Sequence, residues 1–117
     1  MKKISLFILT FAFFGVLALV SDPLTLKGVI IDNQCVGHAG DNISEFVKTH
    51  TKECALMPSC VASGYSIFAD GKLHKFNKES NKKIEEFLKK ETNKLEVVVT
   101  VEKAGDVLNL ITIANQE

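Results

Sequence analysis

The stretch Tyr65-Ser-Ile-Phe-Ala-Asp-Gly-Lys-Leu-His-Lys-Phe76 decides the fold of this chain, because it predicts a β-hairpin. Two short runs rich in aliphatic and aromatic residues, 65–69 and 73–76, flank the dipeptide Asp70-Gly71. Asp-Gly between such runs is a strong hairpin signal, because both residues tolerate the left-handed backbone of a tight turn. A second hairpin is predicted from strands at 95–102 and 107–113, which lie on either side of Ala104-Gly105-Asp106. Short hairpins join antiparallel strands, so the sheet is expected to be mostly antiparallel.

A first strand is predicted at 24–32, Leu-Thr-Leu-Lys-Gly-Val-Ile-Ile-Asp, where Gly28 suggests a bulge or bend. A helix with Ser80 as its cap and an apolar face of Ile84, Phe87 and Leu88 follows the first hairpin. The fold class is therefore mostly β with one or two helices. The order of elements predicts a five-stranded OB-like barrel with a Cys/His-containing insertion between strands 1 and 2. A small α+β antiparallel sheet is the alternative.

The insertion, residues 33–63, is predicted to contain a helix that begins after Asn42, with Glu45 completing a capping box. Its apolar stripe would consist of four residues at helical spacing, Ile43, Phe46, Val47 and His50. Cys54 would extend this stripe if the helix continues. Pro58 is suited to begin a second short helix, which Gly64 would end.

The N-terminus has the three parts of a secretory signal peptide. Lys2 and Lys3 give a positive start, residues 4–20 carry no charge, and small residues precede Asp22. We therefore expect residues 1–21 to be a signal peptide and 22–117 to be a single small β-barrel-like domain in the periplasm or outside the cell. An uncleaved anchor is the alternative, but no stable membrane span is expected after cleavage.

Without Lys2 and Lys3, twelve lysines face fourteen acidic residues, a net charge of −2, and the chain has no arginine. Arginine is the usual residue for bidentate contacts to bases and phosphates. The lysines also alternate with acidic residues, so no nucleic-acid partner is expected.

Cysteine and histidine gather in the insertion, where five of the six such residues of the chain lie between positions 35 and 60. Thiolate and imidazole are ligands of zinc and copper. Cys35 and His38 are separated by two residues, a common chelating step. His50 and Cys54 would share one face of a helix. The predicted metal ligands are Cys35, His50, Cys54, Cys60 and His38, and the ion would be Zn or Cu. Met57 is a reserve ligand. Asp32 could add a carboxylate ligand or orient a histidine.

A structural disulfide competes with this interpretation, because exported cysteines usually oxidise. Cys54 with Cys60, or Cys35 with either of them, would join the insertion to the barrel. The odd number of cysteines leaves one thiol over. His50 on an apolar stripe also fits a packed helix residue, and Met57 fits the core. A thiol oxidoreductase is the third hypothesis, disfavoured because the chain lacks a C-x-x-C motif.

The runs Gly28-Val-Ile-Ile-Asp32-Asn-Gln-Cys35, Cys54-Ala-Leu-Met-Pro-Ser-Cys60 and Ser63-Gly64-Tyr65 carry a resemblance. With the later Asp70-Gly71-Lys72, they resemble an uncharacterised family of small exported bacterial proteins with a G-x-x-x-D-x-x-C opening and a downstream His/Cys-Cys cluster. The resemblance implies export and a shared cysteine site, and it implies no substrate. The five residues between Cys54 and Cys60 make this cysteine pair wider than the family's.

The sequence thus predicts an exported, small, non-catalytic protein, not an enzyme, that binds a transition metal or metal cofactor through its Cys/His cluster. The alternative is a disulfide-stapled structural or interaction module of the cell envelope, whose partner would be an envelope protein.

Overall fold

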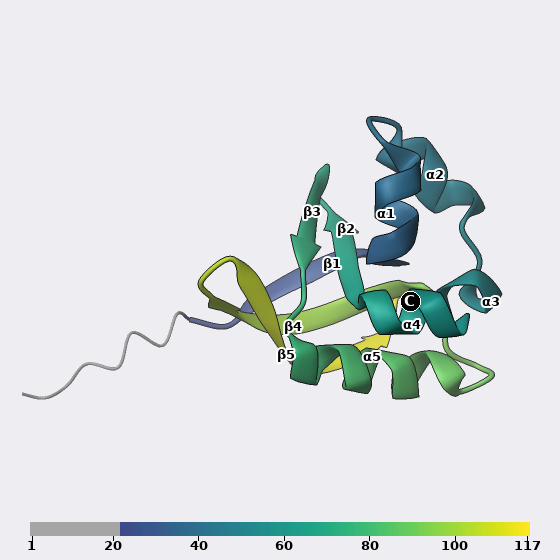
Figure 1. Ribbon diagram of the computed structural model, residues 1–117. Helices are drawn as coiled ribbons and strands as arrows, with labels where there is room; N and C mark the ends of the chain where they lie inside the picture. Colours follow the sequence, from purple (N-terminus) through teal and green to yellow (C-terminus); the bar gives the residue numbers. More distant parts are fainter. Residues whose placement is uncertain (1–21) are drawn as a thin grey trace, which may run out of the picture.

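Five strands form one antiparallel sheet in the computed structural model, which describes residues 22–117 (Figure 1). The strands are β1 (Leu24–Asp32), β2 (Tyr65–Ala69), β3 (Lys72–Lys75), β4 (Glu96–Ala104) and β5 (Val107–Asn115). Their spatial order is β3-β2-β1-β4-β5, so both hairpins flank the first strand. The predicted signal peptide, residues 1–21, lies outside the described residues.

Both predicted hairpins are confirmed. Asp70 and Gly71 connect β2 to β3 with φ values of 53° and 73°. Those two positive values are what a tight hairpin turn requires, and they explain Asp-Gly at this position. The second hairpin pairs β4 with β5 from Val97↔Asn115 to Ala104↔Val107.

Gly28 lies where β1 changes partners. Residues 24–29 of β1 pair with β4, and residues 29–32 pair with β2. A Cβ atom at Gly28 would overlap the backbone oxygen of Phe68, so glycine permits the close approach of β2. The register irregularity of the sheet lies instead at Thr100/Val101 in β4, and the bulge expected at Gly28 is not found there.

The prediction of one or two helices was wrong, because the described residues contain five. They are α1 (Asn33–Ala39), α2 (Ile43–Thr49), α3 (Lys52–Ala55), α4 (Pro58–Ser63) and α5 (Lys78–Lys89). The insertion alone contains α1 to α4. His50 adopts an extended backbone and ends α2, and the side chain of Thr51 accepts from the Cys54 N–H to begin α3. Asn42 precedes α2 without a side-chain cap, whereas Pro58 begins α4 as expected.

Helix α5 begins earlier than predicted, because Asn77 caps it by accepting from the Ser80 N–H. The Ser80 hydroxyl is thereby free to accept from the Leu110 N–H of β5 at 2.7 Å. Ile84 and Leu88 turn inward and are fully buried. Figure 1 shows α5 running beside β5, so the helix covers part of the outer edge of the sheet.

The sheet curls without closing. Among the described residues, Phe76, which directly follows β3, forms an isolated parallel bridge with Leu108 of β5, and the Asn77 N–H donates to the Leu108 oxygen at 2.9 Å. The coarse prediction of a mostly β, antiparallel fold is therefore confirmed, but the closed OB-like barrel is not.

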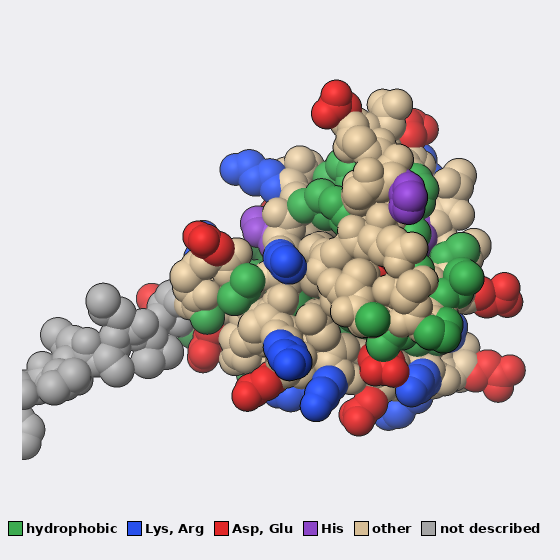
Figure 2. Space-filling view, viewed as in Figure 1, with side chains coloured by type: hydrophobic (Ala, Val, Ile, Leu, Met, Phe, Trp, Pro, Cys, Tyr) green, Lys and Arg blue, Asp and Glu red, His purple; other side chains and the backbone are tan. Residues whose placement is uncertain are grey.

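The core lies between the curled sheet and α5, and Tyr65, Phe76, Ile30 and Ile67 are among its fully or almost fully buried side chains. Lysine and acidic side chains are interspersed on the visible face of the molecule (Figure 2). In residues 22–117, no helix has the length and apolar character needed to cross a membrane.

Candidate metal centre

The centre begins with Asp32, the last residue of β1. Its backbone is extended, with φ −76° and ψ 147°, and its carboxylate caps α1 by accepting from the Cys35 N–H at 2.9 Å. Because the strand ends in a helix at this point, Cys35 lies within the first turn above the carboxylate. The Cys35 sulfur lies within 4.8 Å of the ligand oxygen of Asp32. The Asp32 side chain is fully buried, so protein groups must satisfy its charge.

His50 approaches the same carboxylate from the end of α2. Its Nε2 lies 2.8 Å from Oδ1 of Asp32, and its side chain is 1% exposed. The ring lies against Phe46, one turn earlier, with the ring centroids 5.7 Å apart. The other ring nitrogen, Nδ1, is buried and has no hydrogen-bond partner among the described residues. A buried imidazole nitrogen without a partner is costly, and it is also a free ligand atom.

Cys60 reaches the centre from α4. It is 5% exposed, and burial together with the neighbouring Asp32 charge raises the pKa of its thiol. The ligand atoms of Asp32, Cys35 and His50 all lie within 4.8 Å of one another. Cys60 is outside that tight group, although the Asp32 charge acts on its thiol. The arrangement therefore offers one carboxylate, one imidazole and one thiol to a single small volume, with a second, buried thiol near the carboxylate.

Asn33 and Ser63 hold α1 and α4 together beside the centre. The Asn33 side chain donates to the Ser63 oxygen at 2.9 Å, and its backbone N–H donates to the Gly64 oxygen at 2.9 Å. The Ser63 hydroxyl accepts from the Gln34 N–H at 3.0 Å and donates to the Cys60 oxygen at 2.6 Å. These contacts set the position of Cys35 relative to Cys60. Asn33 and Ser63 lie within the runs that carry the resemblance, but the sequence did not predict their contacts, because these join residues about thirty positions apart.

Hydrogen bonding decides the charge of Asp32. Burial alone would raise its pKa, but hydrogen bonds from the Cys35 N–H, both thiols and His50 outweigh burial and lower the pKa. Asp32 is therefore a carboxylate at neutral pH.

The two thiols experience the opposite effect. Burial, reinforced by the neighbouring Asp32 charge, raises the pKa of Cys35 to about 12 and also raises the pKa of Cys60. Both are neutral thiols at pH 7 while no cation is present. A reactive cysteine needs surroundings that lower its pKa, such as nearby positive charge, so these thiols are poor nucleophiles. A bound cation would favour both thiolates.

The structure brings two of the five ligands predicted from sequence, Cys35 and His50, into one group with Asp32, and the buried Cys60 lies outside that group near the Asp32 charge. Cys54 and His38 are outside the group. Cys54 lies on α3 and is partly exposed. It does not share a helical face with His50 as expected, because α2 ends at Thr49. His38 is exposed in the last turn of α1.

Asp32, expected as an additional or orienting carboxylate, is central. Met57, the reserve ligand and an expected core residue, is 53% exposed, so its core assignment was wrong. Cys35, Cys54 and Cys60 are free thiols in the described part of the chain, and the expected disulfide is not confirmed.

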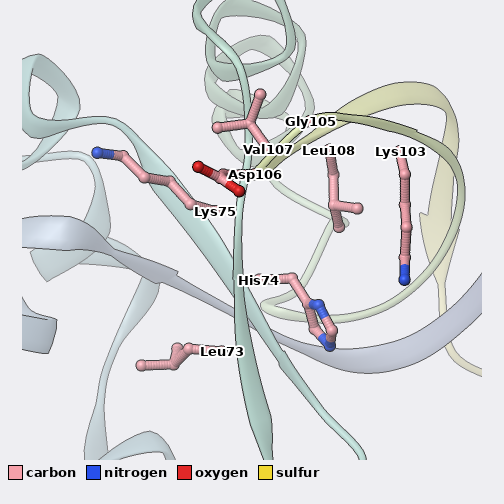
Figure 3. A pocket seen from close by; sticks show the side chains of 8 residues that line it. All are labelled: Leu73, His74, Lys75, Lys103, Gly105, Asp106, Val107 and Leu108. Carbon is pink, nitrogen blue, oxygen red and sulfur yellow. The ribbon is translucent and has the colours of Figure 1, made fainter.

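A separate hollow of about 290 Å³ lies between β3 and the β4–β5 hairpin (Figure 3). His74 points towards the side of Lys103 and Leu108, whereas Lys75 projects to the other side of β3. The hollow shares no residue with the Asp/Cys/His group, and mixed charges line it, including Asp106.

Comparisons with family models, curated proteins and solved structures find no match to this chain in any of the three. The class of the protein is thus given by its fold and its site. It is a small antiparallel β-sheet protein in which Asp32 of β1 and Cys35 and His50 of the helical insertion bring their ligand atoms within 4.8 Å of one another.

Proposed function

We propose that this protein is a small, exported, non-catalytic metal-binding protein. It would hold one transition-metal ion through Asp32, Cys35, His50 and Cys60. The observation that carries the proposal is the convergence of three ligand atoms, from Asp32, Cys35 and His50, within 4.8 Å of one another, with the buried Cys60 thiol near enough to feel the Asp32 charge. The Nδ1 atom of His50 is also buried without a hydrogen-bond partner among the described residues, so it has a free lone pair while Nε2 faces Asp32.

The donor set fits zinc best. Zn²⁺ accepts thiolate, imidazole and carboxylate ligands in a tetrahedral arrangement, and four such side chains are within reach. Copper(I) prefers thiolate and thioether ligands. The residues that would make a softer, copper-selective set lie elsewhere, since Cys54 is outside the group and Met57 is exposed.

A non-catalytic role is supported by the same surroundings. The neighbouring carboxylate and burial disfavour a reactive thiolate at Cys35 and Cys60. A four-ligand zinc site would also be closed, which is typical of structural rather than catalytic zinc. The proposed OB-like barrel is supported by the strand order and by the parallel contact between Phe76 and Leu108. The proposed export rests on the pattern of residues 1–21.

The test is zinc binding by the reduced full-length chain, purified without oxygen and with a phosphine reductant. Mass spectrometry should give about one equivalent of zinc, and competition with a chromophoric chelator should give its affinity. Cys60→Ser and His50→Gln should each weaken binding at least about 100-fold, because even the loss of outer contacts costs 10–100-fold.

Cys54→Ser and His38→Gln are the matched controls, since the same residue types are changed outside the group. Both should keep the wild-type affinity. Less than about a tenth of an equivalent of zinc in the reduced protein would refute the proposal. Equal losses in Cys54→Ser and Cys60→Ser would also refute the assigned site.

The alternative function is a disulfide-stapled structural or interaction module. The hydrogen bonds that join α1 to α4 beside Cys35 and Cys60 favour this pair over either pairing with Cys54. A Cys35–Cys60 disulfide would join α1 to α4. Alkylation of the native protein before reduction, followed by peptide mass mapping, distinguishes the two functions. The stapled module predicts a protected Cys35 and Cys60, a modified Cys54 and no metal.

A further inference from the structure

We infer that Lys52 is a positioning residue of the metal site, which holds His50 in place by fixing its segment to the end of α5. This inference rests on the proposed function and names a further residue on which metal binding depends. Its basis is one ammonium group. Nζ of Lys52 donates to three backbone oxygens, those of Asn93 at 2.7 Å, Lys90 at 2.9 Å and Glu91 at 3.3 Å. A lysine ammonium has three N–H donors, so each has an acceptor here.

The acceptors lie where α5 ends, with Lys90 as the C-cap of the helix. The last carbonyl groups of a helix have no partner within it and carry partial negative charge, so they favour a cation. The turn that follows is fixed to α5, because the Asn93 side chain donates to the Phe87 oxygen at 2.9 Å. Lys52 therefore binds to a surface of defined shape, between 38 and 41 positions further along the chain.

The same turn is connected to the strand that carries the carboxylate. The Leu95 oxygen accepts from the Ile30 N–H of β1 at 2.9 Å. Ile30 lies two residues before Asp32, and Lys52 lies two residues after His50. The ammonium thus closes a second connection between the imidazole and the carboxylate, in addition to their own hydrogen bond of 2.8 Å.

Hydrogen bonds rather than close packing hold this end of α3. A hollow of about 350 Å³ opens beside His50 and Lys52. The other end of α3 is held separately, because the Tyr65 hydroxyl donates to the Ala55 oxygen at 2.7 Å. Loss of the ammonium should therefore free the end next to His50 and leave the rest of the helix in place.

Lys52→Met removes the three donors and keeps an unbranched side chain of similar length. The imidazole should then spend less time at the site, so that fewer ligands hold the ion. Loss of a group that orients a metal ligand typically weakens binding 10–100-fold, and we expect a loss of at least about 10-fold in zinc affinity.

The experiment compares zinc affinities of the reduced, full-length chain by competition with a chromophoric chelator. Lys48→Met is the matched control, because Lys48 is exposed on α2 and its ion pair with Glu45, at 3.0 Å, lies on the surface, where such pairs contribute little. It should bind zinc as the wild type does. Circular dichroism checks the fold of each variant. If Lys52→Met does not fold, Lys52→Gln, which keeps a shorter donor, replaces it in every comparison.

A double variant separates positioning from a general loss of stability. If Lys52 acts through His50, Lys52→Met should change the zinc affinity of His50→Gln by about twofold or less, because the group that Lys52 positions is already gone. Equal weakening in the wild-type and His50→Gln backgrounds would show that the effect does not pass through the imidazole, and would overturn the inference.

The position of His50 can also be measured without metal, by its reaction with diethyl pyrocarbonate and peptide mass mapping. Its side chain is 1% exposed, so it should be protected in the wild type and in Lys48→Met. The exposed His38 should react in all variants and serves as the internal standard. Lys52→Met should make His50 reactive, because the freed segment opens locally.

The outcomes distinguish this inference from the proposed function. If the reduced wild type binds no zinc, the proposed function fails, and the reactivity of His50 alone decides whether Lys52 positions it. If the wild type binds zinc and Lys52→Met binds it as tightly as Lys48→Met does, the inference is overturned and the metal site stands. Protection of His50 in folded Lys52→Met would overturn it as well.

Discussion

Replacing Asp32 with asparagine should lower the free energy of unfolding by about 2 kcal/mol in the reduced, metal-free protein. Asp32 is the natural target, because its buried carboxylate accepts from the Cys35 N–H and pairs with His50 at 2.8 Å. Asparagine has nearly the same shape and caps helices as well as aspartate does, so the cap of α1 should survive. What is lost is the charge that strengthens the bond to His50.

The magnitude follows from the type of hydrogen bond. A bond to a charged group contributes about 1.5–3 kcal/mol, and a neutral one about 0.5–1.5 kcal/mol. The asparagine amide also brings N–H groups that the buried site was not built to accept, so a net loss of about 2 kcal/mol is expected. For a domain of this size, that loss corresponds to a fall in Tm of roughly 8–16 °C.

The assay is thermal unfolding followed by circular dichroism, with a chelator and a reductant present to exclude metal and disulfide effects. Asp41→Asn is the matched control, because Asp41 is exposed in the turn between α1 and α2. Its effect should stay within about 0.5 kcal/mol of zero. If Asp32→Asn and Asp41→Asn change the Tm equally, Asp32 does not organise the centre and the reasoning is wrong.

Two further predictions test the framework that positions the centre. Gly28→Ala should lower the free energy of unfolding by about 2 kcal/mol or more in chemical denaturation, because the added Cβ meets the Phe68 oxygen. Gly37→Ala is the control: it has open space around it and should stabilise α1 by about 0.5–1 kcal/mol. Similar effects of the two substitutions would contradict the close approach of β2. Tyr65→Phe should cost about 1–2 kcal/mol, because the hydroxyl donates to the buried Ala55 oxygen at 2.7 Å. Burial raises the pKa of Tyr65, so its hydroxyl stabilises the fold fully below pH ~10, and stability should fall as the pH rises above that value; Tyr65→Phe should show a smaller fall in an alkaline titration of the Tm.

Local sequence signals were enough to predict the sheet. Asp70-Gly71 and Gly105-Asp106 mark the two hairpin turns, and the alternating Val97, Val99 and Val101 are fully buried, as a half-buried strand requires. Such features depend on neighbours within a few residues, so the chain order displays them directly. The insertion was harder, because its helices are too short to show a periodic stripe, and one continuous stripe through His50 and Cys54 was the wrong interpretation.

The sequence by itself determined the hairpins, the gathering of cysteine and histidine between residues 35 and 60, and the importance of Cys35, His50 and Cys60 as candidates. Only the tertiary structure decided that Asp32 joins Cys35 and His50 and that Cys54 and His38 do not. The physical reason is that a site depends on distances between side chains from different elements. Those distances follow from the cap of Asp32 on α1, the end of α2 at His50 and the contacts of Asn33 with Ser63. None of these is encoded by spacing along the chain.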